Sequence, residues 1–276
     1  MERLKIVKLS PTENMTVLVE TPVPRARHAE IAAELMACGG VNCEQVGYIE
    51  PAQDRAARAR LQMMGGECCG NAAMSLAALL CFREGMPDGT ETDVPLEVSG
   101  AENTLFCHIR RISECEYEGA VAMPRPLSIE RRVLSCEGFS GAVICVRMDG
   151  ITHLLLEASR LKEADPGVLL RRWAALFEEE AVGLVLCDFA RNEIRPLVYV
   201  KPTGSAVWER GCGSGSAAYG AAAAWMTGKA VEIPVRQPGG VITVKADAER
   251  VEIRGRVKIV MQGEAWVSSA LSESAE

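Results

Sequence analysis

The sequence contains the same short motif twice, and each copy carries a thiol. Near residue 69 it reads ECCGNAAMSLAALL, and near residue 212 it reads RGCGSGSAAYGAAAAW. In both copies Cys is followed by Gly, by a residue that can cap a helix (Asn71 or Ser214), and by an Ala-rich stretch of high helix propensity. A tight turn needs Gly or Asn, but it does not need Cys at the same place twice. The repetition therefore marks Cys69 and Cys212 as candidate catalytic residues.

A thiol at the start of a helix is suited to acid–base chemistry. The first N–H groups and the positive end of the helix dipole favour the thiolate, and they also bind anions. If the two turns face each other across a cleft, their amides can bind one carboxylate, with a cysteine on either side of the adjacent carbon. One thiolate then removes the α-proton and the opposite thiol returns a proton to the other face. The motif pair predicts two-base inversion of a stereocentre.

The segments around the two motifs follow one order. Strands are predicted at 4–9 and 16–19, a helix at 28–38 and a strand at 45–50, ahead of the first motif. The second half repeats this order with strands at 141–147 and 152–157, a helix at 167–180 and a strand at 182–188. A strand follows each Ala-rich helix, at 95–99 and at 231–235. Because residues 218–225 carry no charge, the second Ala-rich helix is expected to be buried almost all round.

Composition excludes several classes of partner and cofactor. The chain of 276 residues has 30 Lys+Arg and 37 Asp+Glu, hence a net charge of −7, with no basic cluster, so we expect no nucleic-acid or membrane partner. An N-terminus without a signal-peptide core and an odd count of 11 cysteines predict a reducing cytoplasm. No C-x-x-C motif, phosphate loop or dinucleotide-binding turn occurs, so neither a metal nor a large cofactor is expected.

A wider set of residues resembles a known family. These are Glu13-Asn14-Met15-Thr16, the run from Cys43 to Glu50, Cys69-Gly70-Asn71-Ala72, Trp208-Glu209 before Cys212-Gly213-Ser214-Gly215, and Gln237-Pro238-Gly239-Gly240. They resemble the diaminopimelate epimerase superfamily of cofactor-independent racemases, and most closely its histidine racemases of staphylopine-type opine metallophore synthesis.

The resemblance implies an α/β (α+β) fold of two pseudo-symmetric domains, each a curled sheet around a central helix, with the active site in the interdomain cleft. It places one domain at 1–118, with a returning strand at 257–268, and the other at 119–256. Residues 269–276 are expected to be a disordered tail. A small amino-acid substrate, no cofactor and a possible homodimer follow from the same resemblance.

Two departures from diaminopimelate epimerase bear on the substrate. That enzyme has Gly-Leu-Gly-Asn-Asp-Phe where this chain has residues 10–15, and a longer loop before its second cysteine, whereas here residues 209–211 run directly into Cys212. These segments hold the far end of diaminopimelate, so their loss argues against that substrate. Histidine is the substrate that the resemblance implies. The alternative substrate is diaminopimelate or another polar amino acid. The alternative reaction is isomerisation of a double bond in an unsaturated carboxylic acid. A thiol-rich metal-binding or redox protein is the non-enzymatic alternative.

The expected site residues fall into a substrate-binding set and a set with structural roles. Glu44 is expected to hold an α-ammonium or an imidazole N–H, and Glu209 is a second acid beside a thiol. Cys43 and Cys68 are expected to pack, Trp208 to pack or to cover the site, and Arg210 to lie on the surface. The histidines at 28, 108 and 153 have no catalytic neighbour in the sequence and are left out of the site. The substrate-binding set consists of Asn14, Glu44, Gly70, Asn71, Glu209, Gly213, Ser214 and Gly215.

Overall fold

The computed structural model describes residues 1–136, 138–162, 164–202 and 204–269. The tail predicted at 269–276 lies, beyond Ser269, outside the described residues. The chain divides into two compact units, which we call unit 1 (Met1–Gly119 with Val257–Glu276) and unit 2 (Ala120–Arg256). Each unit is described by itself.

Unit 1 contains two α-helices and a sheet. Its elements are β1 (Glu2–Pro11), β2 (Thr16–Val19), the 3-10 turn η1 (Arg25–Arg27), α1 (His28–Met36), β3 (Gln45–Glu50), β4 (Ala59–Met63), α2 (Gly70–Arg83), β5 (Glu91–Val98), β6 (Leu105–Ser113) and β7 (Glu116–Met123). The strand order is β1-β2-β3-β4-β5-β6-β7.

Unit 2 repeats this order of elements and adds two strands, β8 (Ser128–Cys136) at its start and β13 (Ser205–Trp208) before its second α-helix. Its other elements are β9 (Phe139–Met148), β10 (Ile151–Glu157), η2 (Ala158–Arg160), α3 (Pro166–Ala174), β11 (Ala181–Asp188), β12 (Glu193–Val200), α4 (Gly213–Thr227), β14 (Val231–Gln237), β15 (Gly240–Ala246) and β16 (Val251–Val267). The strand order is β15-β14-β12-β11-β10-β9-β8, with β13 beside β12. The last strand continues past Arg256 and pairs with β1 in unit 1.

The two units share one strand topology. In unit 1, β1–β2 is antiparallel, β2–β3 parallel, β3–β4 antiparallel, β4–β5 parallel and β5–β6 antiparallel. In unit 2, the pairs β9–β10, β10–β11, β11–β12, β12–β14 and β14–β15 alternate in the same way. The repeated sequence motif is thus accompanied by a repeated fold, mixed α/β with much sheet and few helices.

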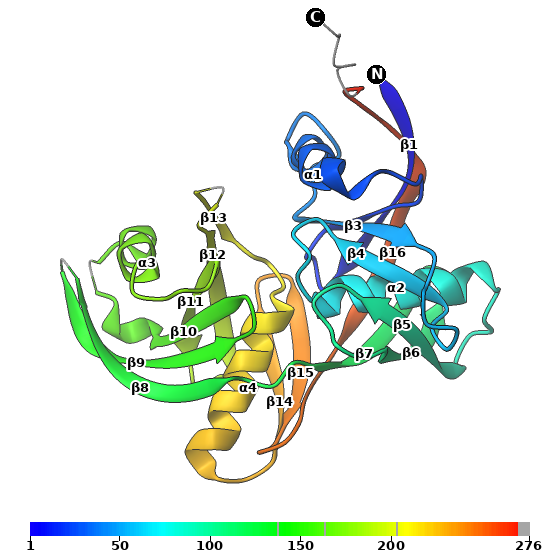
Figure 1. Ribbon diagram of the computed structural model, residues 1–276. Coiled ribbons are helices and arrows are strands. Elements are labelled where there is room, and N and C mark those ends of the chain that lie inside the picture. The colour runs from blue at the N-terminus through cyan, green and yellow to red at the C-terminus, as the bar shows by residue number, and fades with distance from the viewer. Residues whose placement is uncertain (137, 163, 203, 270–276) are drawn as a thin grey trace, which may run out of the picture. The chain divides into compact units, whose positions relative to one another are not determined.

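The Ala-rich helices α2 and α4 are the buried helices of their units (Figure 1). Helix α2 packs against β1, β2, β4, β5 and β6, and α4 packs against β9, β10, β14 and β15. A Cβ on Gly220 would lie 2.4 Å from Val244 Cγ1, so this glycine lets α4 approach β15 closely. The predicted burial of residues 218–225 is confirmed except at its end, where Trp225 is 46% exposed.

The outer helices α1 and α3 are amphipathic and cover a second hydrophobic cluster in each unit. Helix α1 contributes Ile31 and Leu35, and α3 contributes Leu169, Leu170 and Trp173. The helix predicted at 167–180 is too long, because α3 ends at Ala174. Beyond it the chain makes tertiary contacts instead: the Phe177 carbonyl accepts a hydrogen bond from Lys201 at 2.6 Å, and Glu179 pairs with Arg147 at 2.8 Å.

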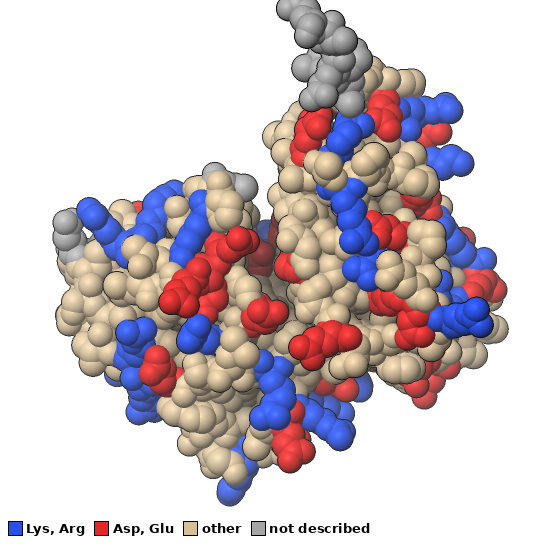
Figure 2. Space-filling model, viewed as in Figure 1, with Lys and Arg blue, Asp and Glu red and all other residues tan. Residues whose placement is uncertain are grey.

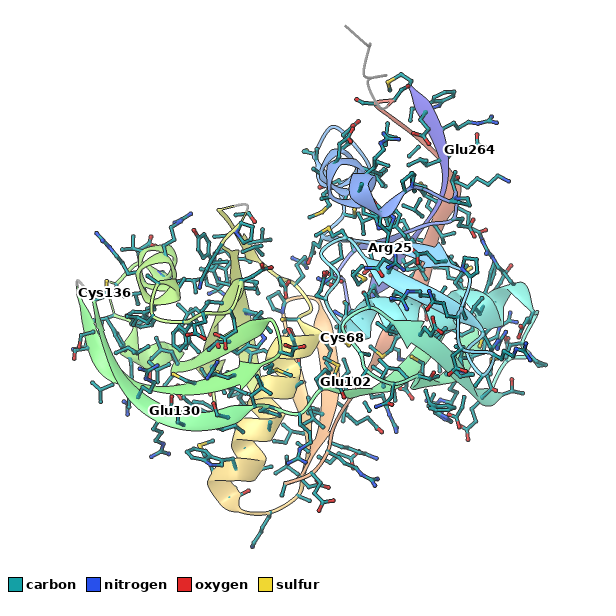
Figure 3. The ribbon with its side chains drawn as sticks, viewed as in Figure 1. Arg25, Cys68, Glu102, Glu130, Cys136 and Glu264 are labelled. Carbon is teal, nitrogen blue, oxygen red and sulfur yellow. The ribbon has the colours of Figure 1, made fainter. Side chains whose placement is uncertain are left out.

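Charged side chains of both signs are mixed over the surface of each unit that Figure 2 shows. Many of them pair, as Arg25 (labelled in Figure 3) does with Glu50 at 2.6 Å. Among the described residues, no helix has the length and apolar character that crossing a membrane requires.

Candidate active site

Cys69 begins the buried helix of unit 1 and caps it with its own sulfur. The residue has extended backbone angles (φ −124°, ψ 108°), and its Sγ accepts the N–H of Ala72 at 3.4 Å. The thiol in turn donates to Oε1 of Gln45, the first residue of β3, at 2.9 Å. A cysteine in the N-cap position is unusual, since Ser, Thr, Asp and Asn are the common caps. The arrangement places a half-buried thiol among the first N–H groups of a helix, at the positive end of the helix dipole.

Beside Cys69 lies a chain of polar side chains built around Asn14. Asn14 follows a turn in which Thr12 and Glu13 have positive φ, and it is completely buried. Its Nδ2 donates to Oε2 of Glu44 at 2.7 Å, and its Oδ1 accepts from Nδ2 of Asn71 at 3.2 Å. The structure therefore brings Asn14, Glu44, Asn71 and the Cys69–Gly70 turn together, as the sequence predicted, and Asn14 holds the Glu44 carboxylate in place.

Cys212 begins the buried helix of unit 2 with the same geometry. Its backbone is extended (φ −95°, ψ 109°), and its Sγ accepts the N–H of Gly215 at 3.2 Å. Its own N–H donates to Oε1 of Gln237 at 2.7 Å, and Gln237 also donates to the Ser216 hydroxyl at 2.8 Å. Gln237, one of the residues that carry the family resemblance and the last residue of β14, thus fixes the start of α4. Because Gly215 gives its N–H to the sulfur, Gly213 and Ser214 provide the remaining amides of this first turn.

Burial and a neighbouring carboxylate both favour the protonated form of Cys212. Burial to 2% exposure raises the pKa of Cys212 well above its ordinary value, and the Glu209 carboxylate raises it further by its charge and by accepting the S–H. The Ser214 hydroxyl and the Gly215 N–H act in the opposite direction, since both donate to the thiolate. Cys212 is therefore a thiol at neutral pH, with donors already in place for its thiolate.

One histidine that the sequence analysis left out of the site contacts the first turn of α4. His153, in the middle of β10, lies with its Nε2 3.0 Å from the Ser214 Oγ, and that oxygen lies 3.5 Å from the Cys212 Sγ. This contact could not be deduced from neighbours in the sequence, because the two residues are 61 positions apart. His28, which stacks on Tyr48 at 3.5 Å, and the exposed His108, paired with Asp93, make no contact of this kind.

Comparison with known proteins identifies the family. The model of the family described as "Histidine racemase CntK N-terminal domain" matches residues 3–266. The chain belongs to this family. It is 30% identical over 278 residues to a histidine racemase of Staphylococcus aureus (strain Mu50 / ATCC 700699), covering 96% of this chain and 98% of the relative. A histidine racemase of Fusobacterium nucleatum is 27% identical over 272 residues, which cover 96% of this chain and 97% of the relative. The protein is therefore an isomerase, an amino-acid racemase.

Solved structures share the fold of this racemase at low sequence identity. A hydroxyproline epimerase from Agrobacterium vitis matches with a TM-score of 0.67 at 14% identity, covering 95% of this chain and 92% of that chain. A probable proline racemase from Agrobacterium radiobacter K84 matches with a TM-score of 0.65, also at 14% identity, covering 98% and 94%. A phenazine biosynthesis protein of the PhzF family from Bacillus anthracis matches with a TM-score of 0.68 at 12% identity, covering 97% of this chain and 100% of that chain.

The remaining residues that the sequence singled out range from buried to exposed. Cys43 packs in the hydrophobic cluster under α1, and burial raises its pKa to about 11. Cys68 (labelled in Figure 3) lies close enough to the buried Cys107 for their charges to interact. Trp208 is 42% exposed, with the Arg195 guanidinium 5.1 Å from its ring, and Arg210 is exposed. All eleven cysteines are free, and among the described residues no group of three His, Cys, Asp or Glu side chains could hold a metal ion.

The contact between Glu209 and Cys212 gives a testable prediction. Replacing Glu209 by glutamine is expected to lower the pKa of Cys212, because the change removes a negative charge that favours the thiol. The pH midpoint for alkylation of Cys212 by iodoacetamide, followed on its peptide by mass spectrometry, should move to lower pH. Glu232→Gln, which alters an exposed carboxylate of unit 2 paired with Lys245, is the matched control. An unchanged midpoint in Glu209→Gln would mean that Glu209 does not hold this proton.

Proposed function

We propose that the protein is a cofactor-independent histidine racemase in which Cys69 and Cys212 act as the two bases. The observation that carries the proposal is the pair of matching helix starts: in each unit a cysteine caps the buried helix and accepts the N–H three residues on. A structural cap does not require a thiol, and the same departure from the usual caps occurs twice in a repeated fold. The proposal requires both sulfurs to reach the α-carbon of one bound substrate.

The reaction moves one proton at a time and needs no oxidant or reductant. The thiolate of one cysteine takes the α-hydrogen as a proton, and the C–H electron pair stays on the α-carbon as a carbanion. The thiol of the other cysteine gives its proton to the opposite face, where that electron pair forms the new C–H bond. The first cysteine ends as a thiol and the second as a thiolate, so the enzyme is ready for the reverse reaction.

The first-turn amides of α2 and α4 provide the electrostatic part of the mechanism. In the proposed complex, Gly70 and Asn71 from one unit and Gly213 and Ser214 from the other bind the substrate carboxylate. Negative charge moves onto this carboxylate as the carbanion forms, and N–H groups aimed at it stabilise the charge without reorganising. The positive ends of both helix dipoles act in the same direction.

The resting enzyme is asymmetric in this proposal. Cys212 donates to a carboxylate, whereas Cys69 donates to the neutral amide of Gln45. A carboxylate acceptor favours the protonated thiol, so Cys212 is proposed as the acid of the first turnover, with Cys69 as the partner base. Turnover in the opposite direction reverses these roles, for which Ser214 and Gly215 supply the donors to the Cys212 thiolate.

Histidine is the proposed substrate because the curated relatives named above are histidine racemases. Glu44, held by Asn14, provides a carboxylate for the α-ammonium or an imidazole N–H of this substrate. Asn71 and Asn14 are polar partners close to the same turn. D-Histidine made in this way would supply the D-amino acid of an opine-type metallophore.

The test is incubation of the purified protein with L-histidine in heavy water, without pyridoxal phosphate and with a metal chelator present. The expected result is decay of the optical signal to zero together with deuterium at the α-carbon. L-Diaminopimelate, L-proline and other L-amino acids, run in parallel, test the substrate. Exchange with another amino acid but none with histidine would overturn the proposed substrate, and loss of all activity on chelation would overturn cofactor independence.

A further inference from the structure

Lys8, on β1, contacts the segment that leads from α1 to β3 (Figure 1). Its Nζ donates to the carbonyl oxygens of Val41 and Asn42, at 3.0 Å each. Asn42 has a φ of 54°, in the left-handed region that few residues other than glycine and asparagine adopt. One ammonium group therefore holds two consecutive carbonyls at an irregular point of the backbone.

The residues that follow this contact lead directly to the polar network around Asn14. Cys43 packs into the hydrophobic cluster under α1, where burial raises its pKa to about 11 and the nearby charge of Lys8 acts in the opposite direction. The N–H of Glu44 donates to the Met15 carbonyl at 2.7 Å, and its Oε2 accepts from Asn14 at 2.7 Å. Glu44 lies two residues after the second carbonyl that Lys8 binds, so the path of this segment determines where the Glu44 side chain begins.

The fold repeat places a basic residue at the same point of unit 2. The paired residues that run across β1, β2 and β3 are Lys8, Val17 and Val46. The paired residues that run across β9, β10 and β11 are Arg147, Thr152 and Val182. Both rows pass through the second residue of each of the two parallel strands, so Lys8 and Arg147 occupy equivalent positions.

The basic residue of unit 2 also binds the segment between the outer helix and the next strand. Arg147 donates through Nε to the carboxylate of Glu179 at 2.8 Å. In the register of the repeat, unit 1 has Cys43 in place of Glu179, and a thiol offers no carboxylate. Lys8 binds two backbone carbonyls instead, so it fixes the path of the chain itself.

We propose that Lys8 is a positioning residue for Glu44: by holding the two preceding carbonyls, it keeps the Glu44 carboxylate where it binds the α-ammonium or an imidazole N–H of the substrate. The inference rests on the proposed function, in which Glu44 is a substrate-binding group. Hydrogen bonds from a charged donor are stronger than those between neutral groups, and an ammonium has enough hydrogens for both carbonyls. Lys8 acts through the backbone of residues 41–44.

The first measurement needs no substrate and follows the backbone at Glu44. The amide hydrogens of Glu44 and Gln45 are both bonded to the Met15 carbonyl, and their exchange with heavy water reports local opening. In Lys8→Met, exchange of both amides is expected to be about 10-fold faster, while the α4 amides keep their wild-type rates. Lys8→Arg, the residue of unit 2 at this position, should restore the rates to within about 3-fold, since a guanidinium also donates to carbonyls. Lys5→Met, which alters an exposed lysine of the same strand, is the matched control.

The second measurement is the kinetics of racemisation of L-histidine. Lys8→Met is expected to raise KM by about 10-fold and to change kcat by less than about 3-fold, because a displaced Glu44 weakens binding of the substrate and the transition state alike. Lys8→Arg and Lys5→Met should keep KM within about 3-fold of the wild-type value. In a Glu44→Gln protein, adding Lys8→Met should leave KM as it is in Glu44→Gln alone, since Lys8 acts through this carboxylate.

Wild-type exchange of the two amides in a folded Lys8→Met protein would overturn the proposal. So would a fall in kcat at unchanged KM, a Lys8→Arg variant as impaired as Lys8→Met, or effects on KM that add in the double variant with Glu44→Gln. If Lys8→Met fails to fold, Lys8→Gln, which keeps a neutral donor, is judged by the same criteria. Failure of the proposed racemase function would appear as a wild-type protein that does not racemise histidine, and amide exchange would still report the contact of Lys8.

Discussion

Replacing either Cys69 or Cys212 by alanine is expected to lower racemisation of histidine by about 10²- to 10⁴-fold, the range that a positioned acid or base contributes. The reason is that inversion needs a proton taken from one face and returned to the other, and each variant leaves one face without a group. The double variant should be little worse than either single one, because the pair acts as a unit. The measurement is the rate of change of the optical signal, starting from each enantiomer.

Exchange of the substrate α-hydrogen with solvent distinguishes the roles of the two cysteines. With one cysteine left, its thiolate can still take the α-proton of the enantiomer that presents the proton to it, and can return a deuteron to the same face. Each single variant should therefore exchange the α-hydrogen of one enantiomer with retention, and the two variants should choose opposite enantiomers. Cys68→Ala, which removes the thiol next to Cys69, is the control and should keep full activity. Racemisation that survives in either alanine variant would contradict the two-base assignment.

The two Cys-Gly turns could be located from the sequence because the residues that mark each turn are neighbours in the chain. Cys69 and Cys212 each lie directly before an Ala-rich helix. The cysteine, the glycine and the capping residue that follow one another therefore mark the start of the helix. The strands 16–19 and 45–50 were predicted with the bounds of β2 and β3, since both carry compact apolar segments between turn residues. The side chains of such strands are largely buried, and a short apolar segment between turn residues indicates this burial in the sequence.

Elements that depend on backbone pairing gave no comparable signal. Strand β8 contains the charged run Glu130-Arg131-Arg132 and is mostly exposed, and it is held by its antiparallel pairing with β9 along its length. The helix predicted at 167–180 failed for a related reason: residues 175–180 have helical composition, but contacts with Lys201 and Arg147 determine their path. Propensity yields to tertiary contacts where the two compete.

The polar networks of the site were visible only in part. Asn14 and Asn71 are 57 positions apart and came together in the prediction through family resemblance, whereas the contact between His153 and Ser214 was not predicted. Its strand reads Ile-Thr-His-Leu-Leu-Leu-Glu, and a single histidine in such a strand indicates core rather than site. The fold repeat provides the missing signal, because Leu18 and His153 each face a glycine on the neighbouring parallel strand.

Changing Asn14 to aspartate is expected to destabilise unit 1 in a pH-dependent way. Asn14 is buried between Glu44 and Asn71, and its Nδ2 lies 2.7 Å from Glu44 Oε2. An isosteric carboxyl there puts two acids in contact, and both cannot ionise in the folded state. One of them must keep a proton that it loses in the unfolded chain, so the folded-state pKa of the pair is raised. At pH 8 the cost should be on the order of 3 kcal/mol, the size expected for an uncompensated buried charge or donor.

The sign of the pH dependence separates this cause from simple loss of a hydrogen bond. A group whose pKa is raised on folding contributes its stability at pH values below its unfolded pKa and loses it as the pH rises through the folded value. The Asp variant should therefore approach wild-type stability at about pH 4, where a shared proton rebuilds a hydrogen bond between the carboxyls, and lose it as the pH rises through the raised folded-state pKa, with the full cost present at pH 8. Asn14→Ala removes the same donor without adding a charge, and its cost should be nearly the same at both pH values. Hydrogen exchange of the α2 amides reports the change in unit 1, and the α4 amides of unit 2 serve as an internal reference. Equal destabilisation of the Asp variant at both pH values would mean that the Glu44 carboxylate does not lie against Asn14 in the folded protein.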